Sequence, residues 1–268
     1  MFRTISITAA LLASVSLANP LFDQNITPDA IFGSGNANGS FTTWTSQGVE
    51  LGLRGKLRFD ASNNPQNTFN SNGDGSYTFQ AGTPPTGFGF APGNPQTAIW
   101  NFEWSINTDV DDTTGTPSRV LGDLTYEIGI DADPSAGTNF LAFDPINSIN
   151  VVNAGVQWDH SIGTNLTGNG GGIEVPNSFA NPGDQALYAS RIASNNVAQN
   201  SWNYLFFATL PPLSGFDPND LGEYEIYLAA FDAGTEIARS TITINVVPAP
   251  ATAMLAGVAG LAAVRRRR

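Results

Sequence analysis

The chain contains no cysteine among its 268 residues. This absence excludes disulfide bonds, thiolate zinc sites and cysteine nucleophiles. The chain has one histidine, so a metal site with several histidine ligands is excluded as well. Stability must therefore come from a packed core, for which a hydrophobic content of 41% suffices. The length fits one large β domain, because sandwiches and barrels often form a single unit of about 200–250 residues.

Basic residues are few and unevenly placed. Arg3 and residues 265–268 make up five of the eleven. The other six lie in the middle of the chain with all 23 acidic residues, so this middle part carries a net charge of −17. A surface so acidic repels phosphate backbones and anionic membranes. The charge argues against nucleic acid as a partner and is compatible with divalent cations.

The first 18 residues have the three parts of a secretory signal peptide. A basic head at Arg3 precedes an apolar run over residues 5–17, and small residues occupy positions 16 and 18. We expect a signal peptidase to cut between Ala18 and Asn19. A buried N-terminal helix is the alternative interpretation.

No hydrophobic run in the sequence is long enough for a comfortable membrane span. The C-terminal run covers residues 251–264, which is 14 residues. As a helix it would measure about 21 Å, against a hydrocarbon core of about 30 Å. The arginines that follow would stay on the cytoplasmic side and leave the folded part outside. The sequence therefore predicts a temporary hold on the membrane, with a permanent tail anchor as the alternative.

The order of features at the C-terminus carries a family resemblance. Pro248, Ala249 and Pro250 precede the short apolar helix, and a terminal arginine cluster follows it, formed by Arg265, Arg266, Arg267 and Arg268. Residues 248–268 resemble the PEP-CTERM sorting signal that exosortases recognise, with Ala249 where that family usually has glutamate. The resemblance implies a precursor held briefly in the inner membrane and handed by the secretion machinery to an exosortase-type enzyme. It also implies a Gram-negative producer of exopolysaccharide and a product at the cell surface or in the extracellular matrix.

Between the two signals the dominant hydrophobic period is two residues, which is typical of β-strands. In residues 49–59 apolar side chains alternate with polar ones, so we expect one face on a core and the other in water. Two similar strands are predicted at residues 100–106 and 124–130. Shorter β-rich runs cover residues 76–79, 140–143, 148–152, 187–192, 202–208, 224–231 and 236–246.

Turn-forming clusters separate these runs, and neither a helical period nor an internal repeat is evident between the signals. The sequence predicts three parts: a signal peptide (1–18), one exported domain (19–247) and the sorting tail (248–268). The predicted fold is all-β, an antiparallel β-sandwich of jelly-roll-like or immunoglobulin-like kind. A signal helix and a short hydrophobic helix are expected to flank it.

Three acidic loops, at residues 72–75, 109–115 and 131–137, could bind calcium, because that ion takes several oxygen ligands from a tight loop. The best candidate is the loop 109–115, with possible ligands Asp109, Asp111 and Asp112. None of the loops completes the twelve-residue calcium pattern. Asp, Asn and Gly also favour turns for backbone reasons alone. Structural turns are therefore the alternative, and no other cofactor is expected.

Tryptophan suggests a second kind of site, because flat aromatic faces bind sugars on many β-sandwich modules. Three of the five tryptophans, Trp100, Trp104 and Trp202, lie in regular alternating runs where burial is the simpler account. Trp158 lies in a Gly- and Asn-rich region and is the candidate for sugar contact.

Catalysis has little support in this sequence. The single histidine, His160, is not accompanied by a G-x-S-x-G motif. A glycosidase-like carboxylate pair could come from Glu103, Glu127, Glu223 or Glu225, which alternation places in solvent. We therefore expect a structural or interaction protein rather than an enzyme. The alternative is a secreted carbohydrate-binding module, for which exopolysaccharide could be the partner.

Overall fold

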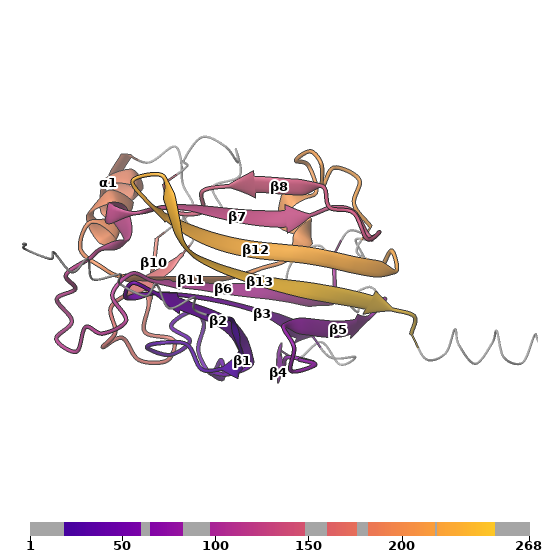
Figure 1. The fold of residues 1–268 in the computed structure, drawn as a ribbon, viewed down its shortest axis with the longest axis horizontal. Helices are drawn as coiled ribbons and strands as arrows, with labels where there is room; N and C mark the ends of the chain where they lie inside the picture. The colour runs from indigo at the N-terminus through magenta and orange to yellow at the C-terminus, as the bar shows by residue number, and fades with distance from the viewer. Residues whose placement is uncertain are drawn as a thin grey trace, which may run out of the picture.

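The computed structural model describes residues 19–59, 65–82, 97–147, 160–175, 182–217 and 219–249. In these residues the chain forms two mostly antiparallel β-sheets, which confirms the predicted all-β class. The segments that carry the expected terminal helices, residues 1–18 and 251–268, lie outside the described residues. Figure 1 shows the two sheets as layers, one above the other.

The first sheet, called sheet A, has the strand order β1-β2-β3-β6-β11-β9-β10, with β4 beside β3. Each pair of neighbouring strands in it is antiparallel. Its strands are β1 (Leu21–Gln24), β2 (Phe41–Ser46), β3 (Val49–Phe59), β4 (Pro65–Thr68), β6 (Trp100–Asn107), β9 (Ser161–Gly163), β10 (Ile173–Glu174) and β11 (Val197–Trp202).

The second sheet, sheet B, has the order β5-β13-β12-β7-β8. Its strands are β5 (Ser76–Gln80), β7 (Thr125–Asp131), β8 (Phe140–Phe143), β12 (Gly222–Asp232) and β13 (Thr235–Val247). Strands β5 and β13 run parallel, so the sheet departs from the wholly antiparallel arrangement that we expected. The other pairs in sheet B are antiparallel.

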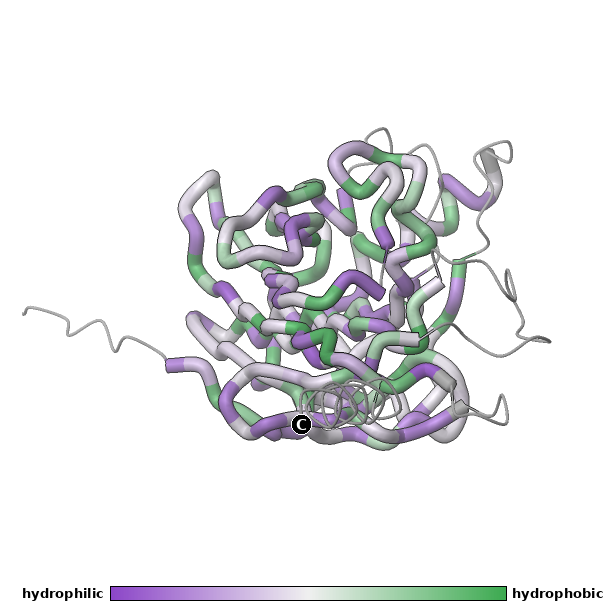
Figure 2. Tube along the Cα trace, turned by 90° about the vertical axis from the view of Figure 1, so that its right-hand side faces the viewer, coloured by the Kyte–Doolittle hydropathy of each residue, from purple (hydrophilic) through white to green (hydrophobic). Residues whose placement is uncertain are grey.

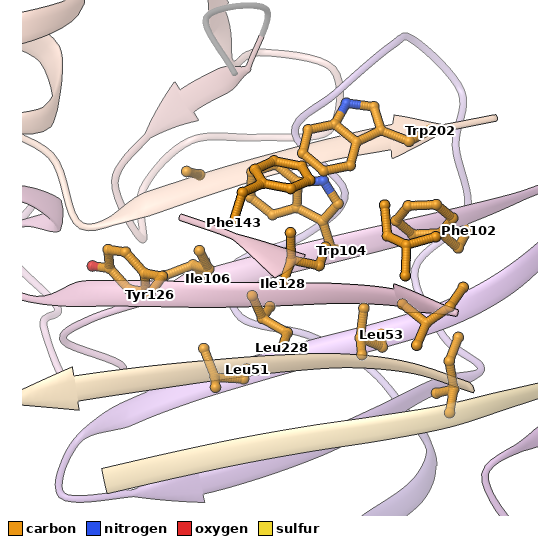
Figure 3. Close-up of a cluster of buried hydrophobic side chains, with 14 of the residues drawn as sticks. Leu51, Leu53, Phe102, Trp104, Ile106, Tyr126, Ile128, Phe143, Trp202 and Leu228 are labelled. Carbon is orange, nitrogen blue, oxygen red and sulfur yellow. The ribbon is translucent and has the colours of Figure 1, made fainter. Parts of the chain in front are cut away.

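The hydrophobic core lies between the two sheets. Leu51 of β3 and Trp104 of β6 are fully buried and project toward Ile128 of β7 and Leu228 of β12 (Figure 3). Burial of Trp100, Trp104 and Trp202 was predicted and is confirmed, since each side chain is at most 1% exposed. Large aromatic side chains remove about 150–250 Å² each from water, so these residues contribute strongly to stability.

Two tight hairpins set the register of the long strands. Gln47 and Gly48 join β2 to β3, and Ala233 and Gly234 join β12 to β13. All four residues have a positive φ, between 46° and 79°. A two-residue turn of this kind matches the twist of the strands it joins, and glycine adopts it without a steric penalty. The tube of Figure 2 shows hydrophilic and hydrophobic residues interspersed along the chain.

The outer face of sheet A is covered, although the alternating pattern in β3 predicts that it faces water. Glu50, Arg54 and Lys56 project from that face and are only 8%, 0% and 2% exposed. The segment at residues 25–40 crosses over them. Its backbone is held by side chains of the sheet, because Thr27 N donates to Glu50 Oε1 at 2.7 Å and Arg54 donates to two carbonyls. The prediction is wrong because alternation reports the polarity of a face and not what packs on it.

A buried charge cluster lies at the centre of this covered face. Arg54 contacts Glu103 of β6 through Nε and Nη2, both 2.6 Å from Oε2, and Lys56 Nζ lies 3.4 Å from the other oxygen. The Arg54 guanidinium also lies 4.1 Å above the ring of Phe41 and 4.0 Å from that of Phe69. Burial lowers the pKa of Arg54, and the attraction of Glu103 opposes that shift. The contacts with Glu103 and the two rings compensate for the loss of water around the cation.

Two of the predicted strands have another conformation. Residues 187–192 belong to the helix α1 (Pro182–Ile192), and residues 202–208 run from the end of β11 into the 3-10 helix η3 (Tyr204–Phe207). A second 3-10 helix, η1 (Leu121–Asp123), precedes β7. The periodicity of a short apolar run does not distinguish a helix from a strand, so other sequence signals decide the conformation. In α1 these are a proline at its first residue and the favourable end charges of Asp184 and Arg191. The predicted strand at residues 148–152 lies outside the described residues.

Candidate functional site

A groove opens between β2 of sheet A and β13 of sheet B. Its volume is about 370 Å³, and its lining is mostly apolar. The lining residues come from the start of the described chain and from the two strands: Pro20, Trp44, Glu236, Ile237, Ala238, Arg239 and Thr241. We refer to this feature as the Trp44 groove.

Trp44 is the half-buried tryptophan of the described residues, in contrast to Trp100, Trp104 and Trp202. It pairs with Leu51 in β3 and therefore shares the inner face of sheet A. Its exposure has a topological cause, because β1 accompanies β2 only as far as the pairing of Leu21 with Thr43. Beyond that pair the indole extends toward β13, where it packs on the edge of the core.

A fixed ion pair forms the polar wall of the Trp44 groove. Arg239 donates from Nε and Nη2 to the carboxylate of Glu236, with the shortest contact at 2.7 Å. Its guanidinium lies 4.3 Å from the centre of the Tyr227 ring. The bonds to Glu236 raise the pKa of Arg239, so the side chain is cationic at every physiological pH. Tyr227 is itself fixed by a 2.6 Å bond from its hydroxyl to Glu127.

The chemistry of this arrangement is that of binding. An aromatic surface, a bidentate ion pair and the Thr241 hydroxyl offer apolar contact and hydrogen bonds to a ligand. Arg239 stays protonated and Glu236 is already engaged by it, so this ion pair provides neither a general base nor a nucleophile. The groove thus has the composition of a recognition site.

The acidic loop proposed for calcium is organised by its own hydrogen bonds. Asp109 accepts from the backbone and hydroxyl of Ser118 at 2.6 and 2.8 Å. Asp112 accepts in the same way from Thr114, which lowers the pKa of its carboxyl group, and its Oδ2 has no partner among the described residues. Asp111 is exposed. Because calcium needs about six to eight oxygens, the carboxylates of this loop supply only part of a site.

The backbone carbonyls of the same loop converge on an amide instead. Asn165 Nδ2 lies 2.8 Å from the carbonyl oxygens of Asp109 and Asp112 and 3.2 Å from that of Val110. Asn196 adds a further contact, at 3.1 Å, to the Asp109 carbonyl. A donor group thus occupies the position where those carbonyls could meet a cation. Across the described part of the chain, no three His, Asp or Glu side chains are grouped as metal ligands.

His160 is a core residue rather than a surface base. It is fully buried, its Nε2 lies 2.6 Å from the carbonyl of Pro145, and its Nδ1 lies 3.4 Å from the Asn200 amide. Its ring also contacts Trp104 edge to face, with the ring centres 4.9 Å apart. Trp158, proposed for sugar contact, lies outside the described residues.

The carboxylates considered for a glycosidase-like pair are divided between the two layers. Glu103 lies on the covered face of sheet A and is fully buried against Arg54, so the prediction that it faces solvent is wrong. Glu127, Glu223 and Glu225 belong to β7 and β12 of sheet B. Glu103 therefore forms no catalytic pair with any of these three.

The sorting residues stand at the boundary of the described chain. β13 ends at Val247, and Pro248 and Ala249 follow it directly. Asn19, the expected first residue after signal cleavage, is exposed. Ala18, Pro250 and the four arginines, Arg265 to Arg268, lie outside the described residues. No helix of the described part is long and apolar enough to cross a membrane.

The residues of the Trp44 groove were not selected from the sequence. Trp44 is one of five tryptophans, and Glu236, Arg239 and Thr241 look like ordinary polar residues of an alternating strand. What brings them together is the partial pairing of β1 with β2 and the packing of β13 against that edge. A pattern of polarity along one strand does not contain either fact.

Comparison with known proteins identifies no relative: no family model matches the chain, no curated protein matches its sequence, and no solved structure matches its fold.

Proposed function

We propose that this chain is an exported protein of the cell surface or extracellular matrix that acts as a structural or interaction module. Its N-terminal segment would direct export, and an exosortase-type enzyme would trim the precursor at or near Pro248, Ala249 and Pro250. The two resemblances at the chain ends and the net charge of −17 between them support this proposal. The two-layer arrangement is compatible with a jelly-roll-like or immunoglobulin-like sandwich between two terminal helices.

The Trp44 groove is the observation that favours binding over catalysis. It joins a half-buried indole to a preformed ion pair, and Glu103, one candidate for a catalytic carboxylate pair, is buried against Arg54. A rigid apolar groove with few fixed polar groups is the usual form of a recognition site. The proposal thus assigns the folded part to contact with other molecules of the envelope.

The sorting half of the proposal is tested by changing the tail alone. Replacing all four terminal arginines by glutamine removes the charges that hold the apolar run in orientation. We expect the variant to accumulate as a longer precursor in cell extracts of the native host, while the wild type is shortened. Equal shortening of both forms would argue that the arginines have no part in processing.

Carbohydrate binding is a second candidate, which the exposed edge of Trp44 favours. Sugars stack on flat aromatic faces, and Arg239 and Thr241 offer hydrogen bonds beside the indole. Trp44→Ala should then abolish retention of the protein on the host's purified exopolysaccharide, whereas Leu166→Ala, at a side chain that is 64% exposed, should not. Equal retention of the Trp44→Ala variant would exclude this site.

A further inference from the structure

Strand β13 is paired on both sides over only part of its length. It has 13 residues, and β12 accompanies it from end to end. On its other side β5 pairs only with the last five, from Thr243 to Val247. No other described strand pairs with the first eight residues on that side. Within the part of the chain that the structure describes, residues 235–242 therefore form an open edge of sheet B.

The direction of the backbone groups along this edge follows from the β5 pairing. Thr243 N donates to Gly75 O at 3.1 Å, and Val247 O accepts from Ala81 N at 2.8 Å. Since backbone groups of alternate residues point to the same side of a strand, those of Arg239 and Thr241 point the same way. Within the described residues, the backbone amides of Arg239 and Thr241 have no hydrogen-bond acceptor other than those in the ladder of sheet B.

Two hollows lie beside the open edge. The Trp44 groove lies along residues 236–241, with Pro20 and Trp44 as its far wall. A second hollow of about 340 Å³ continues past Thr241 and is bounded by Asp74 and Glu223. Thr241 lines both hollows. The Trp44 groove thus lies along the open residues 236–241, and the second hollow adjoins it at Thr241, beside the paired residues Thr243 and Asn245.

The charges around the edge are mainly negative. Asp74, Glu223 and Glu236 stand against the single cation Arg239, which Glu236 already binds. Hydrogen bonds from Ser76 lower the pKa of Asp74, so that carboxylate is ionised near neutral pH. Residues 236–242 contain neither proline nor lysine, which often protect such an edge, and the pairing with β12 is irregular opposite Ala230 and Phe231. A second copy of this acidic chain would be repelled, whereas a basic segment would be attracted.

We propose that the open edge of β13 binds an extended basic peptide segment of a partner protein, which adds to sheet B as a strand in line with β5. The inference rests on the proposed interaction role and names its partner class. Backbone hydrogen bonds to Arg239 and Thr241 supply affinity. Inward side chains of the incoming strand contact Trp44 and Pro20, and its lysines or arginines meet Asp74, Glu223 and Glu236. The open length of eight residues, 235–242, lies within the usual length of a strand.

The test uses the purified protein and synthetic nine-residue peptides in which valine alternates with lysine and threonine. A matched peptide carries N-methyl groups on two adjacent central residues, which blocks hydrogen bonding along both of its edges. We expect the unmodified peptide to bind and to slow hydrogen exchange at the amides of Arg239 and Thr241. N-methylation, or glutamate in place of lysine, should weaken binding by about tenfold or more.

Two variants at one position separate the backbone from the side chain. Thr241→Pro removes the amide hydrogen that faces the open edge and should abolish peptide binding. Thr241→Val keeps that hydrogen, removes only the hydroxyl group and should bind the peptide much more tightly than Thr241→Pro does. If Thr241→Pro fails to fold, the N-methylated peptide tested on the unchanged protein decides the question.

The inference is overturned if the amides of Arg239 and Thr241 already exchange slowly in the free protein. It is equally overturned if no peptide binds, if the N-methylated peptide binds as well as the unmodified one, or if a folded Thr241→Pro variant keeps its affinity. If the wild-type protein binds no peptide and Thr241→Val is no longer retained on exopolysaccharide, the edge is assigned to sugar binding. Export and trimming are measured separately on the same variants, by the length of the secreted chain. Failure of peptide binding at the β13 edge therefore does not count against export and trimming.

Discussion

The guanidinium of Arg54 lies 2.6 Å from the carboxylate of Glu103, and neither side chain has any exposed surface. The same guanidinium donates to the carbonyls of Ala37 and Gly39, which belong to the segment that covers sheet A. The pair therefore joins two strands of the sheet and fastens a long loop over them. It also removes a cation from an already acidic surface. Three of the six basic residues between the signals lie in β3, and the two that are nearly or fully buried are Arg54 and Lys56.

Breaking this pair should destabilise the protein strongly. Arg54→Met leaves the buried Glu103 with only the longer contact to Lys56, and it removes the donor from two carbonyls. We expect a loss of about 3–5 kcal/mol in the free energy of unfolding, measured by urea denaturation. Hydrogen exchange in residues 25–40 should also accelerate, because the covering segment loses its attachment.

The matched control for this change is Arg239→Met. Its partner Glu236 has a side chain that is 41% exposed, so the pair stands largely in water. Exposed ion pairs contribute about 0–1 kcal/mol, and the control should lose no more than that. Equal losses for the two variants would contradict a structural role for the buried pair.

Stability should depend on pH through Glu50. Burial raises the pKa of its carboxyl group from 4.5 to about 7, against a smaller opposing effect of the bond from Thr27. Between those pH values the folded protein keeps a proton that the unfolded chain has lost. The free energy of unfolding should therefore fall as pH rises through this window, by up to about 3 kcal/mol.

The variant Glu50→Gln isolates this effect, because glutamine keeps an oxygen for the Thr27 amide and does not titrate. The difference in stability between Glu50→Gln and the wild type should grow from pH 4.5 to pH 7 and then level off. Glu174→Gln, at an exposed position, serves as the control and should show no such trend. A difference that is the same at every pH would refute the assignment.

Asn165 should be essential to the acidic loop. Asn165→Ala leaves the carbonyls of Asp109, Val110 and Asp112 without their shared donor, which we expect to cost about 1–3 kcal/mol. The neighbouring change Leu166→Ala, at an exposed side chain, should cost less than about 0.5 kcal/mol. Thermal melts of the three proteins give the comparison, and similar losses for both variants would show that the amide has no special role.

Calcium should leave the wild-type protein unaffected, because the loop carbonyls already accept hydrogen bonds from that amide. We expect the melting temperature to be the same with and without about 1 mM calcium chloride. A calcium-dependent rise that disappears in Asp109→Asn would instead establish a metal site, with the loop rearranged around the ion.

The sequence predicted strands well where apolar and polar residues alternate over a long run. The prediction for residues 49–59 coincides with β3, and that for residues 100–106 lies within β6. It failed at residues 187–192, where a short run without clear period belongs to a helix. The Trp44 groove could not be predicted from the alternation of residues along single strands. Its indole and the Arg239 side chain belong to different sheets, and the packing of β13 against β2 brings them together.

Intact-mass measurement of the protein recovered from the surface of the native host tests the central claim most directly. We expect a chain that begins at Asn19 and lacks the arginines at positions 265–268. A surface form whose mass includes Met1 and Arg268 would contradict it, because both end segments would then have remained in place.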